Sequence, residues 1–192
     1  MTVRSKMAAL GLVVVVAGSG GVAWARKGKP AKAKTVATAD IAAKSSSTVK
    51  GTATFSDEGK AGLKLVIDVS GAPPGTHAVH IHEKGDCSSP DGKSAGDHWN
   101  PTHMEHGKWG APEGHHHLGD IGNLEVKADG TGTITLTTDK WTASGGGVND
   151  VVGHAIIVHG GVDDFKTQPT GNAGPRIGCG VIVAATAAPA AK

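Results

Sequence analysis

Histidine is the residue type with the clearest chemical potential in this chain. All eleven histidines lie between His77 and His159. The neutral imidazole is the most common metal ligand among side chains. Only two cysteines are present, so thiolates cannot dominate a metal site here. The composition therefore predicts a nitrogen-rich transition-metal site.

The spacing of the histidines indicates which of them can share an ion. His80 and His82 are two residues apart, so both imidazoles leave the same face of a β-strand. His159 ends another apolar run and could supply a third nitrogen from a neighbouring strand. The other candidates come from one long polar segment and its exit, namely His98, His106, His117 and Asp120. Three imidazoles and a carboxylate suit tetrahedral zinc, whereas an open set of three or four nitrogens suits copper(II), and the residues alone leave both metals open.

The elements that must position these ligands are predicted to be strands. Alternating or continuous apolar runs occur at residues 48–55, 63–69, 124–126, 132–137, 154–159 and 180–183. Between two of these runs, Ala128-Asp129-Gly130 is typical of a hairpin turn. No stretch keeps a helical apolar period for three turns, and the 30 glycines fall in recurring turn clusters. The pattern predicts an all-β fold, an antiparallel Greek-key sandwich or flattened barrel.

Two long segments fit no strand, residues 84–119 and residues 160–178. Loops of this length are uncommon in a compact domain and are usually functional. Cys87 lies in the first loop, and Cys179 follows the second. In an exported chain a disulfide between them is the default. It would enclose about ninety residues, which the chain-entropy model values at about 4–5 kcal/mol.

The first 47 residues lack the apolar patterning of the folded domain. Residues 1–25 have the layout of a secretory signal peptide, with basic residues before an apolar run and Ala23-Trp24-Ala25 as the cleavage site. The run is short and followed by glycines, which argues against a membrane anchor. Residues 26–47 are rich in Lys, Ala, Thr and Ser and predict a flexible basic leader. We place the folded domain at residues 48–184 and a frayed tail at residues 185–192.

Charge is divided unevenly between these parts. Residues 1–47 hold 8 Lys/Arg against 1 Asp/Glu, a net charge of +7. Residues 48–192 hold 11 against 16, a net charge of −5. A nucleic-acid site would have to rest on the basic leader alone, and a charge run of this kind is usually solvated. We therefore expect no nucleic-acid partner, although the leader could contact acidic cell-surface polymers.

The motifs around the histidines resemble those of the copper/zinc superoxide dismutases, in family order over residues 48–184. They are His80-Ile81-His82-Glu83, Gly85-Asp86-Cys87, Ser94-Ala95-Gly96-Asp97-His98-Trp99-Asn100-Pro101, His117-Leu118-Gly119-Asp120-Ile121-Gly122-Asn123, Val158-His159 and Gly171-Asn172-Ala173-Gly174-Pro175-Arg176-Ile177-Gly178-Cys179-Gly180. The short loop from Gly85 to Asp91 is similar to that of the exported bacterial branch.

The resemblance implies a ligand set for two metals. Copper would be held by His80, His82, His98 and His159. Zinc would be held by His98, His106, His117 and Asp120, with His98 as a bridging imidazolate. Asp163 matches an outer carboxylate that accepts hydrogen bonds from His80 and His106, which fixes the orientation of both ligands. Cys87 and Cys179 match the intrasubunit disulfide of the family.

The resemblance also implies the activity. Superoxide would be dismutated to O2 and hydrogen peroxide by alternate reduction and reoxidation of the copper, with His98 carrying a proton between the two half-reactions. Arg176 matches the arginine at the mouth of the substrate channel, and Lys166 could add positive charge nearby. Because the domain is acidic, attraction of the superoxide anion would have to be local, from Arg176 and the two bound ions.

The sequence departs from the family pattern in a few places. Ala78-Val79 and Trp99 replace a Gly-Phe pair and a Phe. The segment between His106 and His117 is about two residues longer than usual, so His115 and His117 compete for the third zinc-ligand position. We prefer His117 because His-x-Gly-Asp fixes the local geometry, which leaves His115, His116 and His103 as exposed loop residues. His77 and His154 are interpreted as structural.

A second function, from a different class, is a copper/zinc binding or delivery module without turnover. Relatives of this fold that lack copper ligands would be candidates for such a role. Here all four copper positions are present together with Arg176, which favours the enzyme. The signal peptide predicts a periplasmic, cell-surface or secreted protein. The sequence leaves a homodimer open.

Overall fold

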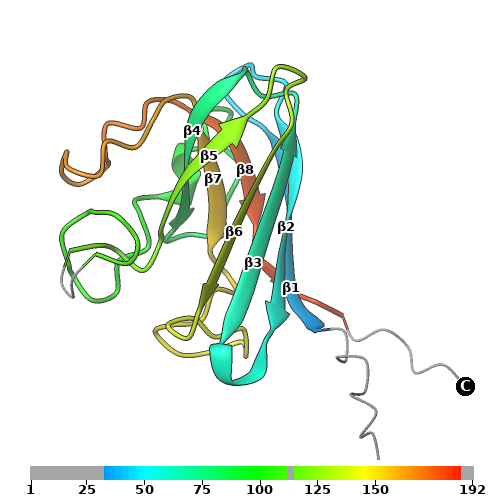
Figure 1. Ribbon diagram of the computed structural model, residues 1–192, viewed down its shortest axis with the longest axis vertical. Helices are drawn as coiled ribbons and strands as arrows, with labels where there is room; N and C mark the ends of the chain where they lie inside the picture. Colours follow the sequence, from blue (N-terminus) through cyan, green and yellow to red (C-terminus); the bar gives the residue numbers. More distant parts are fainter. Residues whose placement is uncertain (1–32, 112–114, 187–192) are drawn as a thin grey trace, which may run out of the picture. The chain divides into compact units, whose positions relative to one another are not determined.

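The computed structural model describes residues 33–111 and 115–186, which form strands and long loops (Figure 1). The strands are β1 (Lys34–Ala43), β2 (Lys50–Asp57), β3 (Leu63–Ser70), β4 (Gly75–His82), β5 (Asp120–Val126), β6 (Gly132–Thr138), β7 (Ala155–His159), β8 (Arg176–Val181) and β9 (Val183–Ala184). The described residues contain two short 3-10 helices, η1 (Gly59–Ala61) and η2 (Lys93–Ala95).

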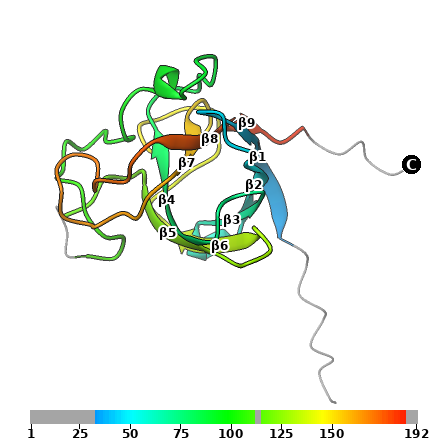
Figure 2. The same cartoon turned by 90° about the horizontal axis from the view of Figure 1, so that it is seen from above.

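The strands close into an antiparallel barrel of eight strands, with the short β9 added beside β1. Their order is β2-β3-β6-β5-β4-β7-β8-β1, and β1 also pairs with β2, which completes the ring (Figure 2). Because β3 lies beside β6 and β4 lies beside β7, the connections are of the Greek-key type. The structure therefore confirms the predicted all-β fold class.

Alternating side chains explain the core of the barrel. Along β2 and β3 every second residue points inward, so that Phe55, Leu65 and Ile67 are fully buried while their neighbours face outward. Trp141 adds an edge-to-face contact with Phe55, with ring centroids 6.1 Å apart. The predicted hairpin joins β5 and β6, and the N–H of Lys127 donates to the carbonyl of Thr131 across it.

Strand β4 is buried on both faces over its second half. Val79 and Ile81 point into the barrel, whereas His80 and His82 point to the opposite face, beneath the long loops. Strand β7, which pairs with β4, is buried throughout and ends at His159. The alternation that gives the barrel its core thus places three histidines on its outside, in the space that the loops cover.

Residues 34–43 correct the prediction of a flexible leader over residues 26–47. They form β1, which pairs with β2, β8 and β9. Ala37, Ala39 and Ile41 are buried on its inner face. Two of these side chains are small, so the segment carries little hydrophobic signal of its own and gains its order from pairing on both edges. The folded domain accordingly begins before residue 48.

The predicted signal peptide (residues 1–25) and the first part of the leader lie outside the described residues. So does most of the predicted frayed tail. The first tail residue, Ala185, still donates its N–H to the carbonyl of Val36. No helix in the described part of the chain is long and apolar enough to cross a membrane.

The two long loops extend from the same side of the barrel (Figures 1 and 2). Gln168 joins them, because its Oε1 accepts the His106 N–H at 2.7 Å and its Nε2 donates to the His106 carbonyl at 2.8 Å. The predicted disulfide between Cys87 and Cys179 is present, and it ties the first loop to β8. The loops are therefore fixed to the barrel and to each other.

Candidate metal centre

Strand β4 supplies two imidazoles whose orientation is fixed by hydrogen bonds. His80 donates from Nε2 to Oδ2 of Asp163 at 2.8 Å, which leaves its Nδ1 free. His82 donates from Nδ1 to the carbonyl of Gly96 at 2.9 Å, which leaves its Nε2 free. Both rings are fully buried. Each imidazole therefore presents one lone pair, and its other nitrogen holds the ring in place.

His159 and His98 complete the same cluster. His159 ends β7 and donates from Nδ1 to the carbonyl of Gly174 at 3.3 Å, leaving Nε2 free. His98 pairs with His82 through an isolated β-bridge, and its Nδ1 lies 3.0 Å from Oδ1 of Asp120. One ligand atom from each of His80, His82, His98 and His159 lies within 4.8 Å of the others.

These free nitrogens are buried without a hydrogen-bond partner. Among the described residues, five buried side-chain polar atoms have no such partner, and four of them are Nδ1 of His80 and Nε2 of His82, His98 and His159. An unsatisfied buried polar group is costly, on the order of 1–3 kcal/mol. Four lone pairs that face one space therefore fit a bound cation, and an all-imidazole set suits copper.

His82, His98 and His159 in this cluster are neutral at physiological pH. Burial lowers the pKa of His82 and of His159 well below the ordinary value, and repulsion from the neighbouring rings lowers it further. Burial also lowers the pKa of His98, to about 4, although Asp120 opposes the shift. The lone pairs are thus available to a metal ion and are not occupied by protons.

A second cluster gathers around Asp120 at the start of β5. Its Oδ1 lies 3.0 Å from Nδ1 of His98 and 3.2 Å from Nδ1 of His117. Its Oδ2 lies 3.0 Å from Nδ1 of His106, and the two Nδ1 atoms of His98 and His117 are 3.4 Å apart. Three imidazoles and one carboxylate converge here, which is a donor set that suits tetrahedral zinc.

The sequence leaves His115 and His117 in competition for one position in this second cluster, and the structure places the two side chains differently. His117 is buried and points at Asp120, whereas His115 is exposed. His80 also comes within 4.8 Å of His98, His106 and Asp120. However, Nε2 of His80 is engaged by Asp163 and its Nδ1 belongs to the first cluster. Of the two competing histidines, only His117 contacts Asp120 and His98 among the described contacts of this cluster.

The ionisable groups of the second cluster shift one another's pKa. Burial alone would raise the pKa of the Asp120 carboxyl, but the three neighbouring imidazoles hold it far below its usual value. Burial would lower the pKa of His106, but Asp120 and Asp163 raise it to about 9. The metal-free cluster thus holds an ionised carboxylate beside a protonated His106, and a divalent cation would displace that proton on binding.

Asp163 accepts a hydrogen bond from one histidine of each cluster. Its Oδ2 accepts from His80, and its Oδ1 accepts from Nε2 of His106 at 2.9 Å. Oδ1 also accepts the N–H of Phe165 at 2.7 Å. Asn123 holds the Asp163 backbone on both sides, accepting its N–H at 2.9 Å and donating to its carbonyl at 3.0 Å. The predicted contacts of Asp163 with His80 and His106 are present. The hydrogen bonds of Asn123 to Asp163 and of Gln168 to His106 could not be predicted from the spacing of these residues.

A cavity of about 650 Å³ opens over the first cluster. His82, His98, His159 and Arg176 contribute to its lining. Arg176 is half-buried and donates from Nη1 to the carbonyl of Gly92 at 2.9 Å. Burial lowers its pKa from the ordinary value, and Asp97 and Asp91 oppose the shift. Lys166 is exposed and is not part of this lining.

The remaining histidines lie outside both clusters. His77 is buried, with its ring nitrogens 2.9 Å from the carbonyl of His159 and 2.8 Å from that of Pro73, so it has a structural place in the core. His154 packs on Trp99, with ring centroids 4.6 Å apart. The loop histidines behave less uniformly than predicted: His103 and His115 are exposed, but His116 is half-buried against Trp109.

Comparison with known proteins agrees with this geometry. The family model described as copper/zinc superoxide dismutase (SODC) matches residues 49–182. The chain belongs to the copper/zinc superoxide dismutase family. Members of this family are oxidoreductases, and the resemblance seen in the motifs is confirmed at the level of the family.

Individual relatives extend over most of the chain. "Superoxide dismutase [Cu-Zn] 2" of Brassica juncea is 41% identical over 145 residues, covering 72% of this chain and 91% of that protein. A crystal structure of a SOD-like protein from Bacillus subtilis has a TM-score of 0.66 at 35% identity and covers 74% of this chain and 95% of that one. The clock protein EA4 has a TM-score of 0.68 at 32% identity and covers 81% and 98%.

Proposed function

We propose that this protein dismutates superoxide to O2 and hydrogen peroxide at the first cluster. The proposed copper ligands are His80, His82, His98 and His159, and the proposed zinc ligands are His98, His106, His117 and Asp120. Copper supplies the one-electron exchange when bound, and zinc supplies a fixed positive charge. The observation that carries the proposal is the set of four unpartnered buried nitrogens beneath a cavity that also holds Arg176.

The residues of the chain have separate tasks in this proposal. Arg176 attracts and orients the anion, since its guanidinium is always cationic and carries donors in a fixed plane. His98 belongs to both clusters, so its Nε2 can take up a proton in the first half-reaction and release it to peroxide in the second. Asp163 holds His80 and His106 in their orientations. Gly96 and Gly174 do the same for the other two imidazoles through their carbonyls.

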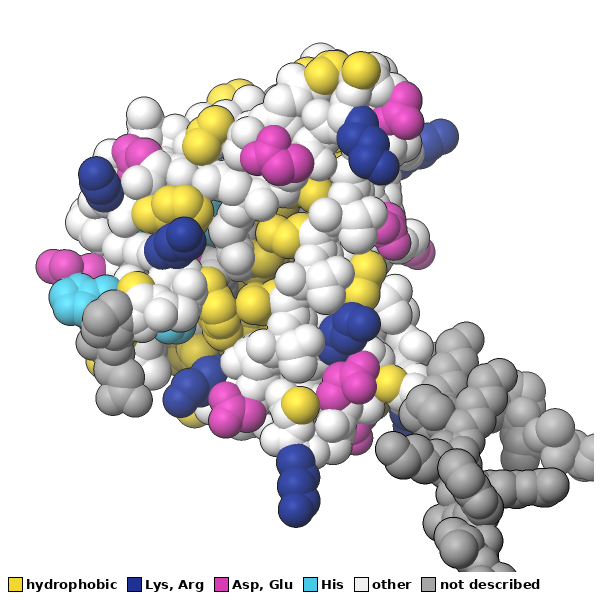
Figure 3. Space-filling view, in the orientation of Figure 1, with side chains coloured by type: hydrophobic (Ala, Val, Ile, Leu, Met, Phe, Trp, Pro, Cys, Tyr) yellow, Lys and Arg dark blue, Asp and Glu magenta, His cyan; other side chains and the backbone are white. Residues whose placement is uncertain are grey.

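Attraction of superoxide must be local in this protein. The region from residue 48 onward has a net charge of −5, and acidic and basic side chains are interspersed over the face seen in Figure 3. Cationic groups that line a cavity can raise the association rate of an anion by roughly 10–10³-fold. Arg176 at the cavity wall fits this requirement.

The test compares superoxide consumption by the copper- and zinc-loaded wild type with that of Arg176→Ala and Arg176→Lys. We expect a fast wild-type rate that falls about tenfold or more in Arg176→Ala and is partly retained in Arg176→Lys. Metal content is measured in each sample as the control. A loaded wild type that removes superoxide no faster than buffer would refute the enzyme and favour the alternative, a non-catalytic binding or delivery module.

We also propose that the protein is of the exported bacterial type, acting in the periplasm, at the cell surface or after secretion. The layout of residues 1–25 and the short loop from Gly85 to Asp91 support this proposal. Cell fractionation and N-terminal sequencing of the mature protein test it, and an intracellular protein that keeps residues 1–25 would refute it.

Contact of the basic leader with acidic cell-surface polymers follows as a separate proposal. Salt should release the longer protein from cells, whereas a chain that begins at Lys32 and keeps β1 should not bind. Whether the protein forms a homodimer is tested by sedimentation.

A further inference from the structure

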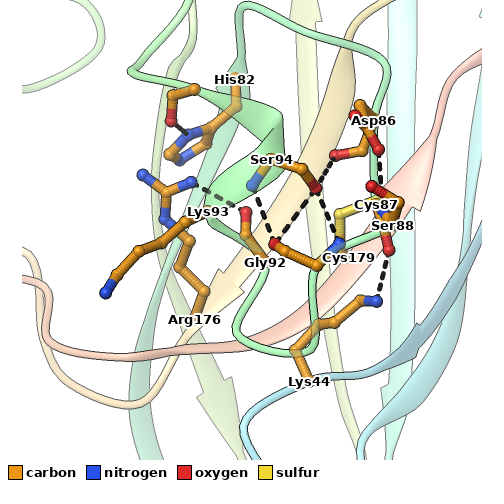
Figure 4. The surroundings of a disulfide bond; sticks show 12 residues. Lys44, His82, Asp86, Cys87, Ser88, Gly92, Lys93, Ser94, Arg176 and Cys179 are labelled. Carbon is orange, nitrogen blue, oxygen red and sulfur yellow. Dashed lines mark hydrogen bonds between the residues drawn. A yellow bond between two sulfur atoms is a disulfide. The ribbon is translucent and has the colours of Figure 1, made fainter.

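Lys44 connects the N-terminal strand to the disulfide loop beside Arg176. It follows directly after β1 and is half-buried. Its backbone N–H donates to the carbonyl of Ile177 at 2.9 Å, in the strand that begins with Arg176. Its Nζ donates to the carbonyl of Cys87 (Figure 4). Lys44 thus bonds both to Ile177, the residue next to Arg176, and to Cys87, where the disulfide loop begins.

The loop that Lys44 holds ends at the carbonyl that receives Arg176. Ser45, the next residue, donates its N–H to the carbonyl of Pro90 at 2.8 Å, so two successive residues after β1 fasten the loop. Gly92 follows in a left-handed conformation, with φ of 72°, and its carbonyl accepts from Nη1 of Arg176 at 2.9 Å. The same carbonyl accepts the N–H of Ala95 at 3.3 Å.

Both cationic side chains lie close to Gly92. A Cβ at this position would lie 3.2 Å from Cβ of Arg176 and 3.6 Å from Cγ of Lys44. The stems of both side chains therefore pack against the backbone of Gly92 from close range. A shift of the loop would move the carbonyl that orients the guanidinium.

We propose that Lys44 is a positioning residue for Arg176, acting through the Cys87 carbonyl and the loop from Cys87 to Gly92. The proposal rests on the proposed function only in that Arg176 is taken to orient the substrate anion. Lys44 does not contact the cavity, because it is not among the residues that line it. Its contribution is mechanical, since a charge-assisted hydrogen bond to a loop carbonyl restricts where that loop can lie.

The test uses Lys44→Met, which keeps an apolar stem but removes the donor, and Lys44→Arg, which restores a cationic donor. The matched control is Lys93→Met. Lys93 lies in the same loop region and has the same charge, but its side chain is 78% exposed and its Nζ pairs with Asp91 at 3.2 Å. The measurements are kcat/KM for superoxide at low and high salt, azide affinity of the loaded enzyme, metal content, and hydrogen exchange of residues 88–96 in metal-free protein.

For Lys44→Met we expect kcat/KM and azide affinity to fall roughly three- to tenfold, a part of the roughly 100-fold loss that a 1 Å misplacement can cause. The loss should persist at high salt, because it arises from geometry and not from long-range charge. Exchange at the amides of Gly92 and Ala95 should become roughly tenfold faster. Lys44→Arg should restore all three quantities, and metal content should stay unchanged.

Two results would overturn the proposal. One is a Lys44→Met effect that disappears at high salt and equals that of Lys93→Met, which would reduce Lys44 to a surface charge. The other is unchanged hydrogen exchange in residues 88–96. If the wild type proves inactive, the proposed function fails, but exchange in the metal-free protein still decides whether Lys44 holds the loop.

Discussion

Gly171 is tightly packed in the metal centre, and its packing yields a sharp prediction. Gly171 has φ of 64° and lies against the bridge between Asp163 and His106. A Cβ built at this position would come within 2.0 Å of Oδ1 of Asp163 and 2.5 Å of Nε2 of His106. Gly171→Ala therefore inserts a methyl group into the hydrogen bond that fixes His106.

The size of the effect follows from two separate contributions. An alanine forced into the left-handed region costs about 1–2 kcal/mol. Displacement of Asp163 from His106 removes a charge-assisted hydrogen bond, which is worth about 1.5–3 kcal/mol. We therefore expect the metal-free variant to lose about 2.5–5 kcal/mol of unfolding free energy. Loss of an outer hydrogen-bond partner also lowers metal affinity about 10–100-fold, here for zinc more than for copper because His106 belongs to the proposed zinc set.

Gly145→Ala separates the two contributions. Gly145 has φ of 79° and is exposed, and a Cβ there meets nothing within 4 Å. It should show the backbone cost alone, with zinc affinity unchanged. Urea unfolding of both metal-free variants and zinc competition with a chelator are the assays. If Gly171→Ala and Gly145→Ala differ by less than about 0.5 kcal/mol and bind zinc equally, the steric reasoning is wrong.

Three other predictions test the loops and the barrel. Asp150 accepts the N–H groups of Ser144, Gly146 and Val152 at 2.7–2.9 Å. These hydrogen bonds outweigh the effect of burial and hold the pKa of Asp150 below the ordinary 3.8. Asp150→Asn should therefore lose about 2 kcal/mol of unfolding free energy above pH 4. Because the pKa is depressed in the folded state, this stability difference should shrink as the pH falls through the folded value, as urea unfolding at several pH values would reveal. His117→Ala should abolish zinc binding in metal analysis while His115→Ala leaves it intact, and equal losses would contradict the placement of His117. Removal of residues 1–43 should prevent cooperative thermal unfolding, whereas removal of residues 1–31 should not change it, and a cooperative transition without β1 would show that the barrel closes without that strand.

Much of the fold could be predicted from the sequence because the barrel core relies on large alternating residues. Phe55, Leu65 and Ile67 define β2 and β3 by period alone. Strand β1 could not be predicted in this way, since Ala37 and Ala39 are small and the segment gains its order from neighbours that are distant in sequence. Its basic, Ala-rich composition resembles that of a linker.

The metal centre, like the fold, could be predicted only in part from the sequence. His80 and His82 could be assigned to one face of a strand from their spacing, and the resemblance of the motifs to the family predicted the other candidate ligands. The supporting contacts were different, because Asn123, Gln168 and Lys44 act on backbone atoms of distant segments. A backbone contact places no demand on the neighbouring sequence, so nothing beside Gln168 or Lys44 marks them, and Asn123 is marked only by its place in the motif that begins at His117. His116 was wrongly grouped with exposed loop residues because Trp109 covers it.

The position of β1 between β2 and β8 has a consequence for the order of folding. Its pairing with β2 is available early in synthesis, but its other edge meets β8 only after nearly all of the chain has been made. His159, at the end of β7, also joins His80 only at that late stage. A chain emerging from its N-terminus therefore cannot close the barrel or complete the first cluster until the end of synthesis. Any metal that this cluster binds would therefore be acquired only after synthesis of the chain is nearly complete.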